Sequence, residues 1–226
     1  WGQNSYGQLG DGTTVGRTSP TAISGLSGVV ELGAGREHTC GRLGDGTVRC
    51  WGRNSFGHLG DGTTMNRVTP VAVSGLGGVV GLSPGAQSNC ARSGDGSVRC
   101  WGSNLAGQLG DGSTTNRTSP VTVQGLSDVA GLSAGWYHTC VWLGAGSMRC
   151  WGSNQYGSLG DGTTTNSLTP TAVPGLSDVV DVAGGSGHTC ARFGDGAVRC
   201  WGSNQLGQVG DWTTIQRLAP ALVWDL

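Results

Sequence analysis

The chain has 226 residues, a formal net charge of −1 and 13 basic residues, all of them arginine. This balance offers no basic patch for nucleic acid or for an anionic membrane surface. No apolar run approaches the roughly 20 residues that a membrane-spanning helix needs. We therefore expect neither nucleic-acid binding nor membrane insertion, and we expect no cofactor.

A repeat of 50 residues runs through the whole chain and is marked by a Trp-Gly pair. The pairs are Trp1-Gly2, Trp51-Gly52, Trp101-Gly102, Trp151-Gly152 and Trp201-Gly202. No insertions or deletions separate the copies. A fixed period of this size indicates one supersecondary unit used repeatedly, in which each copy buries its apolar face against the next.

The first copy is incomplete. Residues 1–25 supply a Trp-Gly strand end, a long loop and one further strand. Because residue 1 falls within a repeat, we expect the assembly to be completed by missing repeats of a longer chain or by a second chain. An incomplete unit exposes unpaired strand edges, which folded proteins avoid.

The first complete unit contains a predicted β-hairpin. Residues 38–43 and 47–51 are strand-like and flank Gly44-Asp45-Gly46, which is a strong hairpin signal. If these three residues form the loop, with the last glycine in the left-handed conformation, Cys40 lies directly opposite Cys50. Directly opposed residues are close enough for a disulfide bond.

The eight cysteines form four pairs, each ten residues apart: Cys40 and Cys50, Cys90 and Cys100, Cys140 and Cys150, and Cys190 and Cys200. An even count at a fixed spacing favours disulfides and an oxidising compartment. Zinc usually requires cysteines two to four residues apart and is disfavoured. Free thiols in a cytosolic protein are the other alternative. We expect an extracellular or cell-surface protein, with the periplasm as a further option.

Each complete unit holds four short strands. A β-branched run at residues 29–32 precedes the hairpin, a glycine-rich ordered loop occupies residues 52–64, and a strand that opens on Pro70 follows at residues 70–73. Four short antiparallel strands with glycine at the corners are typical of a β-propeller blade, whereas a β-solenoid usually has shorter rungs. The prediction is an all-β propeller of four-stranded antiparallel blades. It contains one repeat domain, residues 1–226, with complete blades at about 29–73, 79–123, 129–173 and 179–223 and a partial blade at residues 1–25.

The segment HTCARFGDGAVRCWGSNQLGQVGD, residues 188–211, resembles the repeat of the regulator of chromosome condensation family. The resemblance covers essentially the whole chain and implies a propeller, most often seven-bladed, that serves as a binding platform. The founding member is a nucleotide-exchange factor for a nuclear GTPase. The paired cysteines look instead like the bacterial, exported branch, and no copy has room for the insertion that the exchange factor uses. The resemblance therefore does not carry exchange activity to this chain.

Catalytic and metal sites are not expected from this set of residues. No Ser/His/Asp or Cys/His constellation is identifiable, and glutamate occurs only as Glu31 and Glu37. His38, His138 and His188 share one repeat position, where each is expected to bond neighbouring backbone. The loop aspartates are each followed by threonines, which favours turn capping over calcium binding. These are Asp11, Asp61, Asp111, Asp161 and Asp211. We expect a non-enzymatic protein.

Positions that differ between copies are the candidates for function, because loop residues that the blade does not require are free to recognise a partner. Exposed aromatic residues such as Trp136 are enriched among binding hot spots. The candidate partner-binding residues are Arg36, Glu37, Trp136, Tyr137, Trp142 and Tyr156. The expected function is protein binding through rim loops. A lectin-like carbohydrate site, a structural segment of a long surface or filament protein, and neutral drift of the loops are the alternatives.

Overall fold

The computed structural model describes residues 1–224, which form sixteen β-strands. The strands group into four antiparallel sheets of four strands each. The first sheet contains β1 (Val29–Ala34), β2 (His38–Leu43), β3 (Val48–Gly52) and β4 (Arg67–Ala72); the second contains β5 (Val79–Pro84), β6 (Ser88–Ser93), β7 (Val98–Gly102) and β8 (Arg117–Thr122). The third contains β9 (Val129–Ala134), β10 (His138–Leu143), β11 (Met148–Gly152) and β12 (Ser167–Ala172); the fourth contains β13 (Val179–Gly184), β14 (His188–Phe193), β15 (Val198–Gly202) and β16 (Arg217–Leu222).

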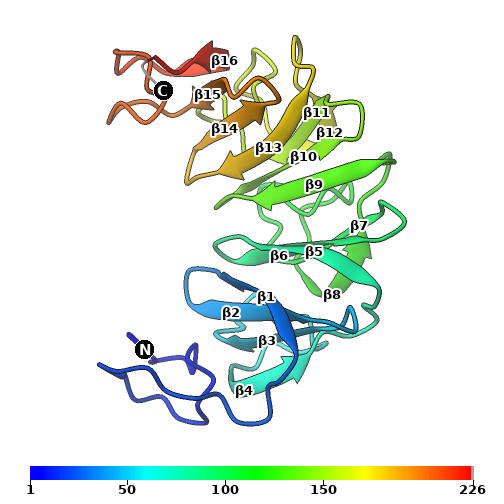
Figure 1. Ribbon diagram of the computed structural model, residues 1–226, viewed down its shortest axis with the longest axis vertical. Coiled ribbons are helices and arrows are strands. Elements are labelled where there is room, and N and C mark those ends of the chain that lie inside the picture. Colours follow the sequence, from blue (N-terminus) through cyan, green and yellow to red (C-terminus); the bar gives the residue numbers. More distant parts are fainter. Residues whose placement is uncertain (225–226) are drawn as a thin grey trace.

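The four sheets are successive blades of an open arc, with both ends of the chain on the same side of it (Figure 1). Each sheet has its strands in chain order, so that β1 and its counterparts lie at one edge and β4 and its counterparts at the other. The predicted all-β propeller with four complete blades and part of a fifth is confirmed. No helix within residues 1–224 is long and apolar enough to cross a membrane.

The predicted hairpin register is confirmed. Cys40 pairs with Cys50 and Arg42 with Val48, and Gly46 has a φ of 78°. The Cα atoms of Cys40 and Cys50 are 4.1 Å apart. All eight cysteines form disulfides within their own hairpins, as predicted: Cys40–Cys50, Cys90–Cys100, Cys140–Cys150 and Cys190–Cys200.

Two predictions about the fourth strand are wrong. Pro70 is the fourth residue of β4 and does not open it. It is tolerated because β4 is an edge strand whose register shifts near the proline. In the partial blade, an isolated bridge between Gly2 and Arg17 replaces the expected strand, because residues 1–28 provide no longer strand with which it could pair.

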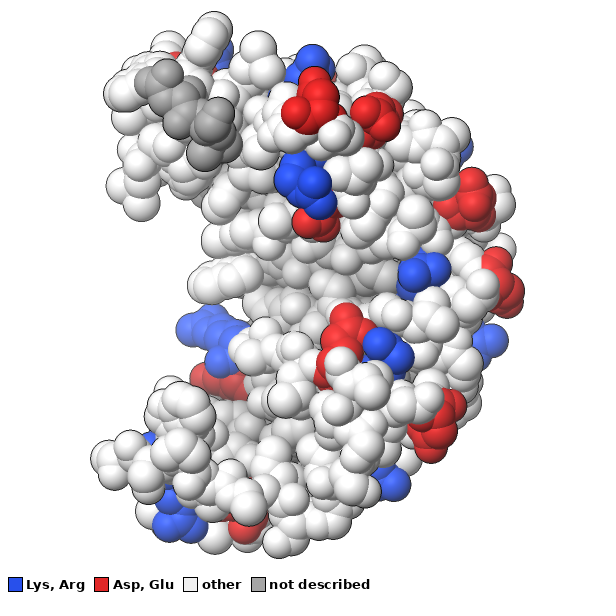
Figure 2. Space-filling view, in the orientation of Figure 1, with Lys and Arg blue, Asp and Glu red and all other residues white. Residues whose placement is uncertain are grey.

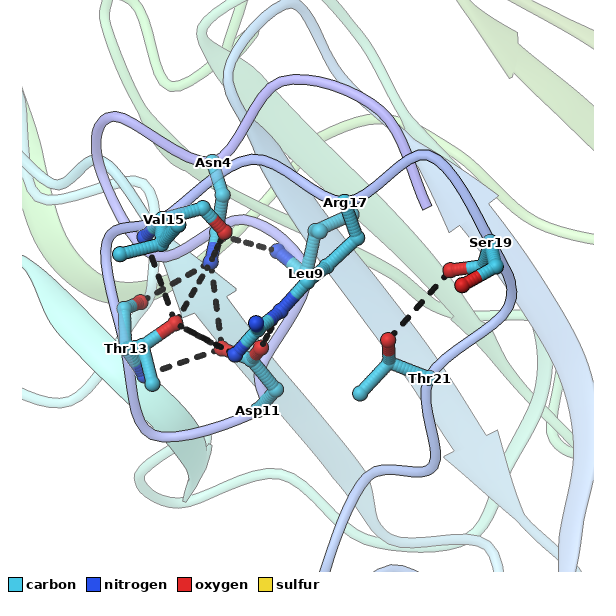
Figure 3. A network of polar contacts seen from close by, with 8 residues as sticks. All are labelled: Asn4, Leu9, Asp11, Thr13, Val15, Arg17, Ser19 and Thr21. Carbon is cyan, nitrogen blue, oxygen red and sulfur yellow. Dashed lines mark hydrogen bonds and ion pairs between the residues drawn. The ribbon is translucent and has the colours of Figure 1, made fainter.

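The loops that connect the third and fourth strands each contain the same arrangement of polar hydrogen bonds. We call residues 3–16, 53–66, 103–116, 153–166 and 203–216 the junction loops. In the first loop, Asn4 Nδ2 donates to Asp11 Oδ1, and Asn4 Oδ1 accepts from the backbone N–H of Leu9 (Figure 3). Asp11 also accepts from the hydroxyl and backbone N–H of Thr13 and from the guanidinium of Arg17. The predicted turn-capping role of the loop aspartate is confirmed.

Each of the first four junction loops also receives the tryptophan of the following blade. The indole Nε1 of Trp101 donates to the carbonyl of His58 at 3.0 Å. Gly60 faces this ring so closely that a Cβ there would lie 2.8 Å from Nε1. The same arrangement places Trp51 against the first loop, Trp151 against the third and Trp201 against the fourth. The four indoles are fully buried, so they connect neighbouring blades as well as filling the core.

The histidines of the repeat connect blades too. His38 Nε2 lies 3.0 Å from Asn89 Oδ1 in the next blade, and His138 Nε2 lies 2.8 Å from Thr189 Oγ1. The predicted backbone partner is therefore wrong for these two residues. The partner is a side chain one repeat further on, and a repeat pattern alone does not show which neighbouring surfaces face each other.

Candidate functional site

The turns between the first and second strands of successive blades meet around one hollow of about 250 Å³. Its lining comes from residues 34–36, 84–86 and 134–136, together with Gly184. Backbone hydrogen bonds join neighbouring turns, from Arg36 N–H to Ala86 O and from Trp136 N–H to Gly185 O, both at 3.1 Å. The turn backbones are thereby held in place while their side chains differ from blade to blade.

Arg36 and Trp136 approach each other across this hollow, although they belong to turns 100 residues apart. The guanidinium carbon of Arg36 lies 5.8 Å from the centre of the Trp136 ring, within the range of a cation–π interaction. Tyr137 packs edge-on against Trp136 with 6.4 Å between ring centres. Trp136 is 42% exposed and Tyr137 is 40% exposed. Each ring therefore presents a large accessible surface that neighbouring side chains already orient.

A second group extends this surface toward the first junction loop. Arg53 Nη1 donates to Glu37 Oε2 at 2.5 Å, and the Arg53 guanidinium carbon lies 5.0 Å from the Tyr6 ring centre. The hydrogen bond with Glu37 raises the pKa of Arg53 above its usual value, which keeps this cation charged at every physiological pH. Arg53 and Glu37 largely neutralise each other, so Arg36 contributes the unpaired charge of the group.

We call Tyr6, Arg36, Glu37, Arg53, Trp136 and Tyr137 the turn surface. Four of the six predicted residues belong to it: Arg36, Glu37, Trp136 and Tyr137. Tyr156 flanks it, because its ring lies against Gly187 in the fourth turn. Trp142 lies at the far end of β10, half-buried against the core and over Gly131, and the structure does not bring it to this surface.

Arg53 and Tyr6 were not among the predicted partner-binding residues. The signal that could have found them is their place at positions that vary between copies, since Arg53 corresponds to Ser103 and Tyr6 to Ala106. Their contact joins two junction loops, and the spacing of a repeat does not reveal it.

The turn surface offers aromatic faces, the backbone groups of the turns and the guanidinium of Arg36, which forms no ion pair with any residue of 1–224. His38 is fully buried, and burial lowers its pKa to about 4 despite the bond with Asn89. Within residues 1–224, no three His, Cys, Asp or Glu side chains gather as a metal site would require.

A family model described as the regulator of chromosome condensation (RCC1) repeat matches residues 1–41, 45–92, 95–142 and 146–192. A second model of the same repeat matches residues 29–57, 129–158 and 179–208. No curated relative matches the chain by sequence.

Solved structures of low sequence identity share the fold. Human WBSCR16 superposes with a TM-score of 0.87 at 24% identity, over 97% of this chain and 60% of that one. Prp20p from Saccharomyces cerevisiae gives a TM-score of 0.82 at 20% identity, over 96% and 55%. Yeast RCC1 (Prp20) bound to Kap60 gives 0.81 at 20% identity, over 96% and 53%. The chain thus spans a little over half the length of these proteins. The family matches cover most of the sequence, and the chain belongs to the regulator of chromosome condensation (RCC1) repeat family.

Proposed function

We propose that the chain is a non-catalytic, exported scaffold that binds another protein through the turn surface. One observation carries this proposal: side chains that differ between copies converge, with Arg36 stacked on Trp136 across the central hollow. Tryptophan, tyrosine and arginine are the residue types most enriched in binding hot spots. Positions that are identical in every copy are explained by the needs of the blade itself. The positions that differ between copies are therefore the ones that can determine which partner is bound.

The fold comparison supports a protein partner. The yeast structures are of Prp20 with Kap60 and of Prp20p described with its binding to Gsp1p and histones. Kap60, Gsp1p and histones are named for the yeast protein. At 20% sequence identity, only the propeller fold can be inferred for this chain. A propeller that presents variable turns on a rigid backbone suits recognition of a folded protein surface.

Partner capture with matched variants tests the binding proposal. Proteins from the surroundings of the producing cell are retained on the immobilised chain, on Trp136→Ala/Tyr137→Ala and on Met65→Ala. Met65 is a suitable control because it is 58% exposed and lies outside the turn surface. A protein retained by the wild type and by Met65→Ala but lost with the double variant supports the proposal. Retention that is equal on all three contradicts it, and sugar-dependent binding abolished by Trp136→Ala shows a lectin instead.

The disulfides support the proposed export. Four bonds that use every cysteine favour an oxidising compartment, in which disulfides form and persist. Counting thiols in denatured, non-reduced protein isolated from its native source tests this point. We expect no free thiol; eight free thiols would overturn the exported assignment and leave the binding proposal standing.

A further inference from the structure

Four of the five junction loops hold an arginine guanidinium on the same two acceptors. In the first loop, Arg17 Nε donates to Asp11 Oδ2 at 2.9 Å, and Arg17 Nη2 lies 3.5 Å from Thr13 Oγ1 (Figure 3). The arginines that bond the other three loops in the same way are Arg67, Arg117 and Arg217. These arginine side chains are 32–39% exposed and their aspartates only 3–8%. Each guanidinium therefore reaches its carboxylate from the solvent side.

The fourth junction loop, residues 153–166, contains the same acceptors. Asp161 Oδ1 accepts from Asn154 Nδ2 at 3.1 Å, and from the backbone N–H and the hydroxyl of Thr163, both at 2.9 Å. The equivalent bonds to Asp61 in the second loop are 3.2, 3.0 and 2.8 Å long. The fourth loop is therefore formed like the others, and Asp161 presents its second carboxylate oxygen, Oδ2, in the same place.

The arginine is missing from the fourth loop, where Ser167 takes its repeat position. The Ser167 hydroxyl bonds Thr171 Oγ1 at 2.8 Å and the carbonyl of Thr169 at 2.7 Å, both in its own strand. Within residues 1–224, Asp161 bonds through Oδ1 alone and forms no ion pair. Thr163 is exposed, whereas its four counterparts are half-buried. Asp161 Oδ2 and Thr163 Oγ1 thus repeat the guanidinium site of the other loops and leave it open to solvent.

We propose that Asp161 and Thr163 bind the guanidinium of an arginine side chain on the protein partner, an inference that rests on the proposed binding function. A guanidinium presents a fixed fork of N–H donors that matches two neighbouring acceptors, whereas an ammonium group is a compact point charge. The site lies in the loop that carries Tyr156. That loop begins beside Tyr137, whose carbonyl accepts the N–H of Ser153 at 2.8 Å. The guanidinium site therefore borders the turn surface.

The distribution of charge favours recognition at a single carboxylate. Acidic and basic side chains are scattered over the face seen in Figure 2 and form no large patch of one sign. The other four loop aspartates are neutralised by arginines of their own loops. A cation on the partner can therefore pair with Asp161 without displacing an arginine of this chain.

Titration of the full chain with the peptide acetyl-Gly-Arg-Gly-amide, followed by amide NMR, tests the proposal. The amides of Thr163 and Thr165 report on the site, because they donate to Asp161 Oδ1 and Thr163 Oγ1. Asp161→Asn keeps one acceptor oxygen and replaces the other with an amide nitrogen. Ser167→Arg supplies the guanidinium from the chain itself. Thermal unfolding of each variant checks that it is folded.

We expect saturable shifts of both amides in the wild type. Asp161→Asn and Ser167→Arg should bind the peptide at least about tenfold more weakly, the loss expected for a hydrogen bond to a charged group. The peptide acetyl-Gly-Lys-Gly-amide should bind the wild type more weakly than the arginine peptide. Arg117→Ser is the converse variant: it should open a second site in the third loop, reported by the amides of Ser113 and Thr115.

Three results would each overturn the proposal: no peptide-dependent shift of the two amides, binding that is unchanged in Asp161→Asn, or equal binding of the lysine and arginine peptides. Such a result, together with protein capture that depends on Trp136 and Tyr137, would remove this site and keep the proposed function. Peptide binding at Asp161 without any captured protein would keep the guanidinium site and remove the protein partner.

Discussion

At the scale of single residues, the junctions depend on glycines whose conformation and lack of a side chain are both required. Gly110 has a φ of 69°, and a Cβ there would lie 2.7 Å from the Nε1 of Trp151. Gly125 has a φ of 72° but no described atom within 4 Å of its Cβ position. The two positions therefore separate the cost of a left-handed conformation from the cost of crowding the indole.

Gly110→Ala should destabilise the chain more than Gly125→Ala. The left-handed conformation alone costs about 1–2 kcal/mol in each variant. Crowding of the buried indole adds about 1–3 kcal/mol in Gly110→Ala. Urea unfolding monitored by tryptophan fluorescence measures the difference. Equal losses of stability in the two variants would show that the indole does not lie against Gly110.

Stability should fall as the pH drops from about 6.5 to about 4, because the buried histidines resist protonation. Burial lowers the pKa of His38 and His138 to about 4, and burial together with His38 lowers that of His58 to about 3. In this window the unfolded chain binds protons that the folded chain does not. The free energy of unfolding therefore falls by up to about 1.4 kcal/mol per pH unit for each such histidine.

The variant His38→Ser tests this assignment, since the second blade carries Ser88 at the same position. It should lower stability at pH 7 and reduce the slope between pH 6.5 and 4, because one buried histidine is removed and His58 loses a neighbour that lowers its pKa. Urea unfolding at several pH values gives the slope. A slope identical to that of the wild type would mean that His38 is not the group that titrates.

At the scale of the element, the β2–β3 hairpin and its counterparts are the most self-contained parts of the blade. A tight glycine turn sets the register and the disulfide then closes it. Both sulfurs are buried at the centre of the sheet, where they belong to the hydrophobic clusters.

Replacing one cysteine pair should cost about 3 kcal/mol, the loop-closure entropy expected for a ring of this size. Cys140→Ala/Cys150→Ala is the suitable variant, because alanine introduces no polar atom at two fully buried sites. Thermal unfolding under non-reducing conditions measures the loss. An unchanged melting temperature would show that the bond adds nothing to the stability of the hairpin.

The same hairpin shows why part of the fold was predictable. Its register follows from local turn chemistry and an Asp-Gly signal, so residues 38–51 were sufficient to predict it. The position of Pro70 within β4 was not predictable in this way. It depends on pairing with β3 across a long loop, and an irregular register moves the start of the strand to Arg67.

At the scale of the whole molecule, four equivalent junctions build a rigid arc that holds divergent turns in a fixed arrangement. The repeat predicted which positions vary, and therefore four residues of the turn surface. It did not predict that Arg36 meets Trp136 across the hollow, or that Trp142 is directed to the core, because both depend on how blades rotate about a common axis.

The affinity of a captured protein partner for the wild-type chain, for Trp136→Ala/Tyr137→Ala and for Met65→Ala tests the central claim most directly. We predict at least about 2 kcal/mol of lost binding free energy for the double variant, roughly a 30-fold weaker dissociation constant. Met65→Ala should bind like the wild type. Equal affinities for the wild type and the double variant would contradict the assignment of the turn surface as the binding site.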